Sequence, residues 1–212
     1  MTSASVCAML QDAFCNQPVT LFRAGWQASG DRPMTDDLDL RDHIRTVPDF
    51  PKPGIMFRDV TTLFSSPLAM RKMIQGFQDQ WADLPYDYVA GIDARGFIIG
   101  GALALHHGVG FVPVRKMGKL PAETIAEDYE LEYGTATIEL HRDAVPAGAR
   151  VLIVDDLIAT GGTALAAINL FRRLDAEIVG CGFLVDLPEL GGAERIAEQG
   201  VSVRSLCAFE GH

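Results

Sequence analysis

From residue 84 onward, short apolar blocks alternate with longer segments of helical periodicity. The blocks predict strands and the longer segments predict helices: strands over residues 88–92, 110–114, 151–154, 178–185 and 201–206, and helices over 97–107, 164–174 and 191–199. This alternation is typical of βαβ units, in which helices cover both faces of a mostly parallel, twisted sheet. We therefore predict an α/β fold and expect ligands to bind at the carboxyl ends of its strands.

Two further helices are expected before this sheet. Residues 38–47 have a short amphipathic pattern that ends at Pro48, and the prolines of residues 48–54 (PDFPKPG) require a loop. Ser66 and Pro67 suit the N-cap and the first position of the second helix. The large apolar side chains of this helix share one face and are expected to pack in the core: Met73, Ile74, Phe77, Trp81 and Leu84.

The composition narrows the class of protein. Of the 212 residues, 48% are hydrophobic and 22% are charged, as in ordinary folded domains, so disordered and fibrous classes are excluded. The net charge of −10 argues against nucleic acid or an anionic membrane as the main partner. The four cysteines have no C-x-x-C spacing, so neither a zinc site nor a structural disulfide is expected. The N-terminus has no secretion-signal pattern, and the cytoplasm is therefore the expected compartment.

The first 33 residues form a different kind of segment, with only four charged side chains and no steady periodicity. They precede a second methionine, Met34. Two interpretations stay open: translation starts at Met34, or residues 1–37 are a poorly ordered N-terminal extension. In both interpretations, residues 38–212 make up the functional domain.

Residues 151–163 (VLIVDDLIATGGT) carry the strongest functional signal. An apolar strand leads into two acids, a loop of small residues and a helix; these residues are Asp155, Asp156, Ala159, Thr160, Gly161, Gly162 and Thr163. Free backbone N–H groups at a helix N-terminus bind phosphate, and the carboxylates can bind a ribose diol and help to hold a hydrated metal ion. There is no Walker A or dinucleotide-binding pattern. The segment predicts a site for a ribose phosphate, and an ordinary strand-to-helix turn is the structural alternative.

This segment resembles the phosphoribosyl-pyrophosphate motif of type I phosphoribosyltransferases. Its Asp-Asp-Leu-x-Ala-Thr-Gly-Gly-Thr form is similar to that of the adenine-specific members. The resemblance covers about residues 38–212 and implies the fold of that family, a mostly parallel sheet flanked by helices with a small N-terminal hood. It also implies a strained or cis peptide near Asp93-Ala94.

Basic residues follow two of the predicted strands and suit a pyrophosphate. Arg95 lies in the turn after residues 88–92, and Arg115, Lys116 and Lys119 come directly after residues 110–114. The polar residues that continue to 134 suit a mobile lid, with a solvated β-ribbon as the alternative. The resemblance favours the lid.

The resemblance also assigns catalytic residues. In adenine-specific members, a Glu-Tyr-Gly at the end of this loop closes over the reactants, and it corresponds to Glu132, Tyr133 and Gly134. Glu132 is then the acid/base that exchanges a proton with the purine ring, and Tyr133 and Arg95 complete the catalytic set.

The purine would lie against the hood. Residues 49–61 resemble the family's base-binding hood, which implies that Met56, Phe57 and Arg58 bind adenine, with Phe57 as the stacking ring. By the same resemblance, Leu184 would cover the other face of the base.

The implied reaction converts adenine and phosphoribosyl pyrophosphate into AMP and pyrophosphate, a step of purine salvage. Mg²⁺ is the implied cofactor, carried by the substrate and reached by Asp155 and Asp156 only through water, and a homodimer is expected because members of the family usually form one. Two alternatives stay open. One is a phosphoribosyltransferase for another purine or pyrimidine base, and the other is a non-catalytic purine or ribose-phosphate sensor with the same fold. The acidic chain has no DNA-binding pattern, which disfavours the sensor.

Overall fold

The computed structural model describes residues 38–130 and 135–211, and these form one mostly parallel α/β unit. Its main sheet has seven strands, in the order β5 (Thr124–Glu130), β6 (Thr135–His141), β4 (Gly110–Lys116), β3 (Tyr88–Ile92), β7 (Arg150–Ile158), β8 (Glu177–Asp186) and β9 (Val203–Ala208). The strands from β4 to β9 in this order run parallel, whereas β6 is antiparallel to both β4 and β5. The predicted fold class is confirmed. The expectations for residues 1–37, Glu132, Tyr133 and Gly134 concern positions outside the described residues.

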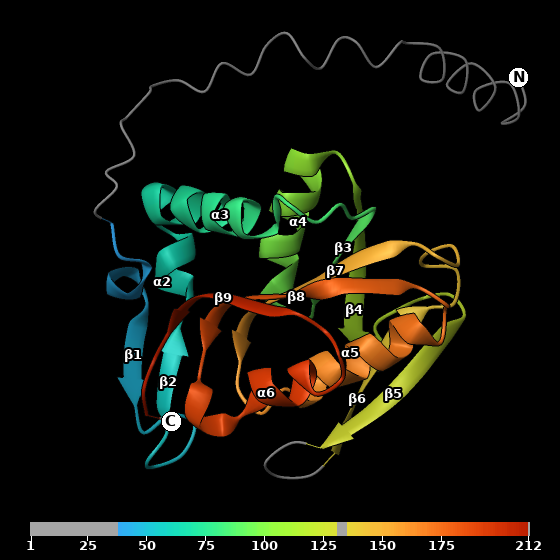
Figure 1. The fold of residues 1–212 in the computed structure, drawn as a ribbon. Helices are drawn as coiled ribbons and strands as arrows, with labels where there is room; N and C mark the ends of the chain where they lie inside the picture. Colours follow the sequence, from blue (N-terminus) through green and yellow to red (C-terminus); the bar gives the residue numbers. More distant parts are fainter. Residues whose placement is uncertain (1–37, 131–134, 212) are drawn as a thin grey trace, which may run out of the picture. The chain divides into compact units, whose positions relative to one another are not determined.

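Helices cover both faces of this sheet (Figure 1). One face carries α3 (Pro67–Trp81) and α4 (Gly96–His107), and the other carries α5 (Gly162–Arg172) and α6 (Gly192–Ala197). No helix within the described residues is long and apolar enough to cross a membrane.

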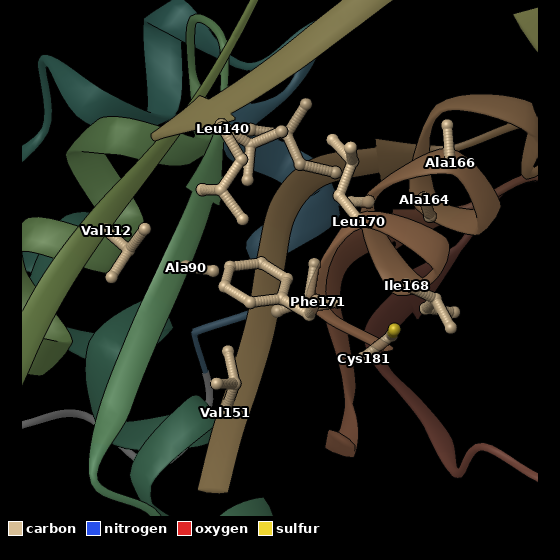
Figure 2. Packing of buried hydrophobic residues seen from close by; sticks show 14 of the residues in the cluster. Ala90, Val112, Leu140, Val151, Ala164, Ala166, Ile168, Leu170, Phe171 and Cys181 are labelled. Carbon is tan, nitrogen blue, oxygen red and sulfur yellow. The ribbon is translucent and has the colours of Figure 1, made fainter. Parts of the chain in front are cut away.

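The continuous apolar run of β7 follows from its central place between these helices. Val151 and Ile153 belong to the core cluster under α5, and Leu152 and Val154 belong to the cluster under α3 and α4. Figure 2 shows the ring of Phe171 on α5 directed toward the sheet near Val151. Because every side chain of this segment is buried, the strand shows no polar alternation.

The N-cap predicted for α3 is confirmed. The Ser66 hydroxyl accepts a hydrogen bond from the backbone N–H of Ala69 at 3.3 Å, and Pro67 is the first helical residue. Met73, Phe77 and Trp81 are fully buried, as the apolar face of this helix predicts.

The helix expected over residues 38–47 is wrong. A short 3₁₀ turn, η2 (Leu40–His43), is followed by the two-stranded hood sheet of β1 (Arg45–Pro48) and β2 (Met56–Asp59), and the short α2 (Thr61–Phe64) comes next. Asp39 caps the turn by accepting from the N–H of Arg41, and Ile44 is already extended. The strand forms because β1 has a partner in β2, and this tertiary pairing overrides the local helical pattern.

One further expectation needs correction, and another gains structural detail. The strand at residues 151–154 continues to Ile158, so Asp155 and Asp156 lie within β7 rather than after it. The polar segment that the resemblance assigns to a lid contains β5, which pairs with β6 along its length. Its described residues therefore form a β-ribbon in which Ile125 packs in the core, and closure of this segment over the reactants stays a prediction.

Candidate active site

A cavity of about 410 Å³ lies at the carboxyl ends of β3, β7 and β8. Most of its lining belongs to the strand–loop–helix segment singled out in the sequence: Asp155, Leu157, Ile158, Ala159, Thr160, Gly161, Gly162, Thr163 and Ala164. Ile92 and Phe183 complete the lining from the neighbouring strands. The cavity is therefore at the sheet edge where the topology predicts a ligand.

The loop from Ala159 to Thr163 has the geometry of an anion site. Gly161 has a left-handed backbone (φ +78°), which turns the chain from β7 into α5, and no side chain of the described residues caps this helix. The first N–H groups of α5 therefore have no intrahelical partner and carry the positive end of the helix dipole. Gly162 and Thr163, the first two residues of α5, line the cavity, so these N–H groups are placed to bind a phosphate there.

The loop rests directly on the start of α6. A Cβ atom added at Gly192 would lie 2.2 Å from the carbonyl oxygen of Ala159, and one added at Gly161 would lie 2.9 Å from the carbonyl oxygen of Gly192. Arg195 donates a hydrogen bond to the carbonyl oxygen of Thr160 at 2.8 Å. Sequence reasoning missed Gly192 and Arg195 because both contact backbone atoms of a loop that is distant in the chain, and such contacts leave no motif.

The two acids of β7 have different surroundings. Asp155 lines the cavity, and its Oδ1 accepts a hydrogen bond from the N–H of Asp156 at 2.9 Å. Asp156 is buried and accepts a hydrogen bond from Nε of Arg95 at 2.5 Å. Burial and the neighbouring charge of Asp156 raise the pKa of Asp155 well above its ordinary value. Only Asp155 is placed to touch a ligand in the cavity, whereas Asp156 holds Arg95.

The basic residues gather beside this edge. Asp93-Ala94 is a cis peptide, as the resemblance implies, and it leads into Arg95 at the start of α4. Arg115 donates from Nε to Asp93 at 3.1 Å and from Nη1 to the carbonyl oxygen of Lys119 at 3.3 Å. These contacts join the turn after β3 to the loop after β4, so the two basic segments lie next to each other, with Lys116 and Lys119 exposed.

The residues expected to hold the base differ in accessibility. Met56 is exposed, and Phe57 is half-buried with its ring edge-to-face with Phe50 at a centroid distance of 5.2 Å. Leu184 is fully buried in the core cluster below α3 and α4 and does not line the cavity. Its neighbour Phe183 does, because successive side chains of a strand point to opposite faces.

Arg58 is engaged with the C-terminal end of the chain. Its guanidinium donates to Oγ1 of Thr46 at 2.6 Å and to the carbonyl oxygen of Glu210 at 3.0 Å, and it stacks over the ring of Phe209 at 4.5 Å. The side chain therefore fastens the hood to the end of the sheet, and the resemblance did not predict this role.

The chain is similar to known phosphoribosyltransferases over most of its length. Residues 60–203 match the family model described as a phosphoribosyl transferase domain. An adenine phosphoribosyltransferase of Dinoroseobacter shibae is 58% identical over 178 residues, which cover 84% of this chain and 99% of that protein.

Two solved structures resemble the fold closely. The adenine phosphoribosyltransferase of Rhodothermus marinus is 50% identical, with a TM-score of 0.76 over 80% of this chain and 96% of that one. The enzyme of the same name from Saccharomyces cerevisiae, solved with an imino-altritol bisphosphate and adenine, is 40% identical, with a TM-score of 0.74 over 79% of this chain and 96% of that one.

Proposed function

Because the chain belongs to the phosphoribosyltransferase family, we propose that it is an adenine phosphoribosyltransferase, which makes AMP and pyrophosphate from adenine and phosphoribosyl pyrophosphate. The observation that carries this proposal is the phosphate loop of residues 159–163, which opens into a cavity beside Asp155. The similarity to adenine-specific relatives selects the base.

The geometry suits transfer of a phosphoribosyl group. The free N–H groups at the start of α5, with Thr160 and Thr163, would hold the 5-phosphate, and Asp155 would accept hydrogen bonds from the ribose hydroxyls. Breaking the anomeric C–O bond puts positive charge on the ribose and negative charge on the leaving pyrophosphate. Nearby cationic side chains stabilise that leaving group: Arg95, Arg115, Lys116 and Lys119.

A magnesium ion would fit this arrangement only as part of the substrate complex. Among the described residues no group of three or more His, Cys, Asp or Glu side chains could hold a metal, and Asp156 is already paired with Arg95. Mg²⁺ usually binds through one or two carboxylates, water and substrate phosphates, so Asp155, which lines the cavity, would reach the ion through water. When bound, the ion would neutralise charge on the pyrophosphate.

Recognition of the base belongs to the hood and to residues 131–134. We propose that Met56 and Phe57 contact adenine, that Arg58 holds the hood in place, and that Glu132 exchanges a proton with the purine while Tyr133 closes the site. The burial of Leu184 makes it a support for the sheet rather than a direct stacking partner. Glu132→Ala should then reduce turnover with adenine far more than affinity for phosphoribosyl pyrophosphate, and equal losses in both would refute this role.

The protein is also proposed to form a homodimer, in the cytoplasm. On α4, Ile98 and Leu105 are seven residues apart on one face, and they are 45% and 82% exposed. Exposed apolar positions on a helix favour contact with a second copy. Light scattering should give twice the chain mass for the wild-type protein and a lower mass for Leu105→Lys, and a monomeric wild-type protein would refute the dimer. Cell fractionation tests the compartment, which rests on the sequence alone.

The assay that tests the reaction measures nucleotide formation from phosphoribosyl pyrophosphate and Mg²⁺ with adenine, hypoxanthine, guanine or orotate. We expect AMP from adenine and little product from the other bases. Product from a different base would keep the phosphate site and overturn the base assignment. No product from any base would support the sensor alternative.

A further inference from the structure

The strand β6 contains a buried acid that the reaction does not use. Glu139 is 5% exposed, and within the described residues only Asp156 is an equally buried acidic side chain. Asp156 has a cationic partner in Arg95, whereas Glu139 forms no salt bridge in the described part of the chain. A buried carboxylate needs strong hydrogen bonds to stay ionised. The groups that donate these bonds therefore indicate which part of the structure Glu139 stabilises.

The partners of Glu139 belong to the loop after β4. Its Oε1 accepts from the backbone N–H of Lys119 at 2.8 Å and from that of Leu120 at 2.9 Å, and its Oε2 is 3.5 Å from Oγ1 of Thr124. Two successive N–H groups converge on one oxygen because Gly118 has a left-handed backbone (φ +78°). The carboxylate therefore fixes the path of the chain that carries Lys119.

The same loop is joined to the neighbouring basic residues. Arg115 is the cross-strand partner of Glu139 in the β4–β6 pairing, and it donates to the carbonyl oxygen of Lys119. It also donates to Asp93 in the turn before Arg95. One connected set of hydrogen bonds thus runs from Glu139 through the loop to the turn beside the cavity.

The ionisation of Glu139 agrees with this arrangement. Burial opposes the charged form, but the N–H groups of Leu120, Lys119 and Gly118, with a smaller part from Thr124, outweigh it and lower the pKa of Glu139. The side chain is therefore an anion near neutral pH, when its hydrogen bonds to the loop are strongest.

We propose that Glu139 is a positioning residue for phosphoribosyl pyrophosphate: it holds the loop of residues 117–120 so that Lys119 and Arg115 meet the pyrophosphate. The proposal rests on the function proposed above. Glu139 itself lies beneath the loop and touches no substrate. Its loss should therefore weaken binding of phosphoribosyl pyrophosphate and leave the adenine site unchanged.

The test compares Glu139→Ala and Glu139→Gln with Glu198→Gln, which removes an exposed carboxylate at the C-cap of α6, far from the loop in the chain. Hydrogen exchange of the Lys119 and Leu120 amides reports on the loop without any substrate. We expect exchange to accelerate by about tenfold or more in Glu139→Ala and by less in Glu139→Gln, whose amide oxygen still accepts both bonds.

Kinetics give the second readout. In Glu139→Ala the KM for phosphoribosyl pyrophosphate should rise about tenfold, with the KM for adenine and kcat within about twofold of wild type. Glu139→Gln should lie between, and it replaces Glu139→Ala if that variant does not fold. Unchanged amide exchange, or equal effects on both substrates, would overturn the proposal. A wild-type protein that makes no AMP would instead refute the proposed function. In that case the exchange rates of the Lys119 and Leu120 amides would still test whether Glu139 holds the loop.

Discussion

The packing of Gly192 against the phosphate loop predicts that one added methyl group will displace the site. In Gly192→Ala the new Cβ would lie 2.2 Å from the carbonyl oxygen of Ala159 and 2.8 Å from the amide nitrogen of Gly161. Real Cβ atoms essentially never approach another heavy atom within 3.0 Å, so the 2.2 Å contact requires a shift of roughly 0.8 Å. Both neighbours are backbone atoms, so no side-chain rotation can relieve the contact. The loop, or α6 beneath it, must move.

The expected effect follows from the position of the loop at the start of α5. A displacement of about 1 Å at a substrate-positioning group can reduce the rate about 100-fold, and overpacking costs about 1–3 kcal/mol of stability. We therefore expect kcat/KM for phosphoribosyl pyrophosphate to fall about 10- to 100-fold in Gly192→Ala. Tm should fall by about 2–4 °C for each kcal/mol lost.

Steady-state kinetics with each substrate varied, together with thermal denaturation, measures both effects. Gly191→Ala is the matched control, because Gly191 has a left-handed backbone (φ +68°) but no heavy atom within 4 Å of an added Cβ. The control should lose about 1–2 kcal/mol through backbone strain and keep the wild-type KM. If Gly192→Ala keeps both the wild-type KM and the wild-type Tm, the loop does not depend on this backbone contact and the reasoning fails.

Three further predictions concern charge and capping. Burial and the charge of Asp156 raise the pKa of Asp155 above the ordinary 3.8, so ionisation of Asp155 lowers the stability of the folded protein as pH rises from about 4. Asp155→Asn should therefore raise Tm at pH 7 while reducing turnover, and a lower Tm would contradict this. Hydrogen bonds from Arg150 lower the pKa of Asp87 to about 2, so the contribution of this ion pair to folding stability is complete above pH 4 and is lost as pH falls toward 2. In denaturant titrations at several pH values, Asp87→Asn should lose less stability in acid than the wild-type protein does. Ser66→Ala removes the N-cap of α3 and should cost about 1 kcal/mol with unchanged kinetics, whereas a loss of kcat would show an effect beyond the helix.

The helices and strands that could be predicted from the sequence are those whose buried side chains form a continuous apolar run or recur with helical periodicity. In β7 the side chains from Val151 to Val154 are all buried, and in α3 the apolar positions share one face. β6 escapes prediction because three successive side chains, Ile138, Glu139 and Leu140, are all buried, so the strand has neither an apolar run nor an alternation.

The strand β5 could not be predicted from its pattern of buried residues either. Of its residues only Ile125 is buried, and polar contacts to α5 and to its C-cap supplement the pairing with β6. Asn169 donates to Glu127 at 3.0 Å, and Arg173 donates to the carbonyl oxygen of Ala126 at 2.7 Å. These contacts join residues some 40 positions apart and leave no local pattern, so the sequence could not show that this segment forms a ribbon.

The site residues that could be predicted are contiguous in the chain, and those that could not be predicted act across long sequence separations. The phosphate loop could be predicted because its acid, its glycines and its helix start are contiguous in the chain, and this order is what an anion-binding turn requires. Gly192 and Arg195 determine where the loop lies through contacts with its backbone atoms. Because these residues are distant from the loop in the chain, the contacts leave no local pattern. Glu139 has the same relation to the basic loop. Changes at Gly192 and Glu139 should therefore alter affinity for phosphoribosyl pyrophosphate by moving the loops that contact it, although every contacting residue keeps its chemical identity.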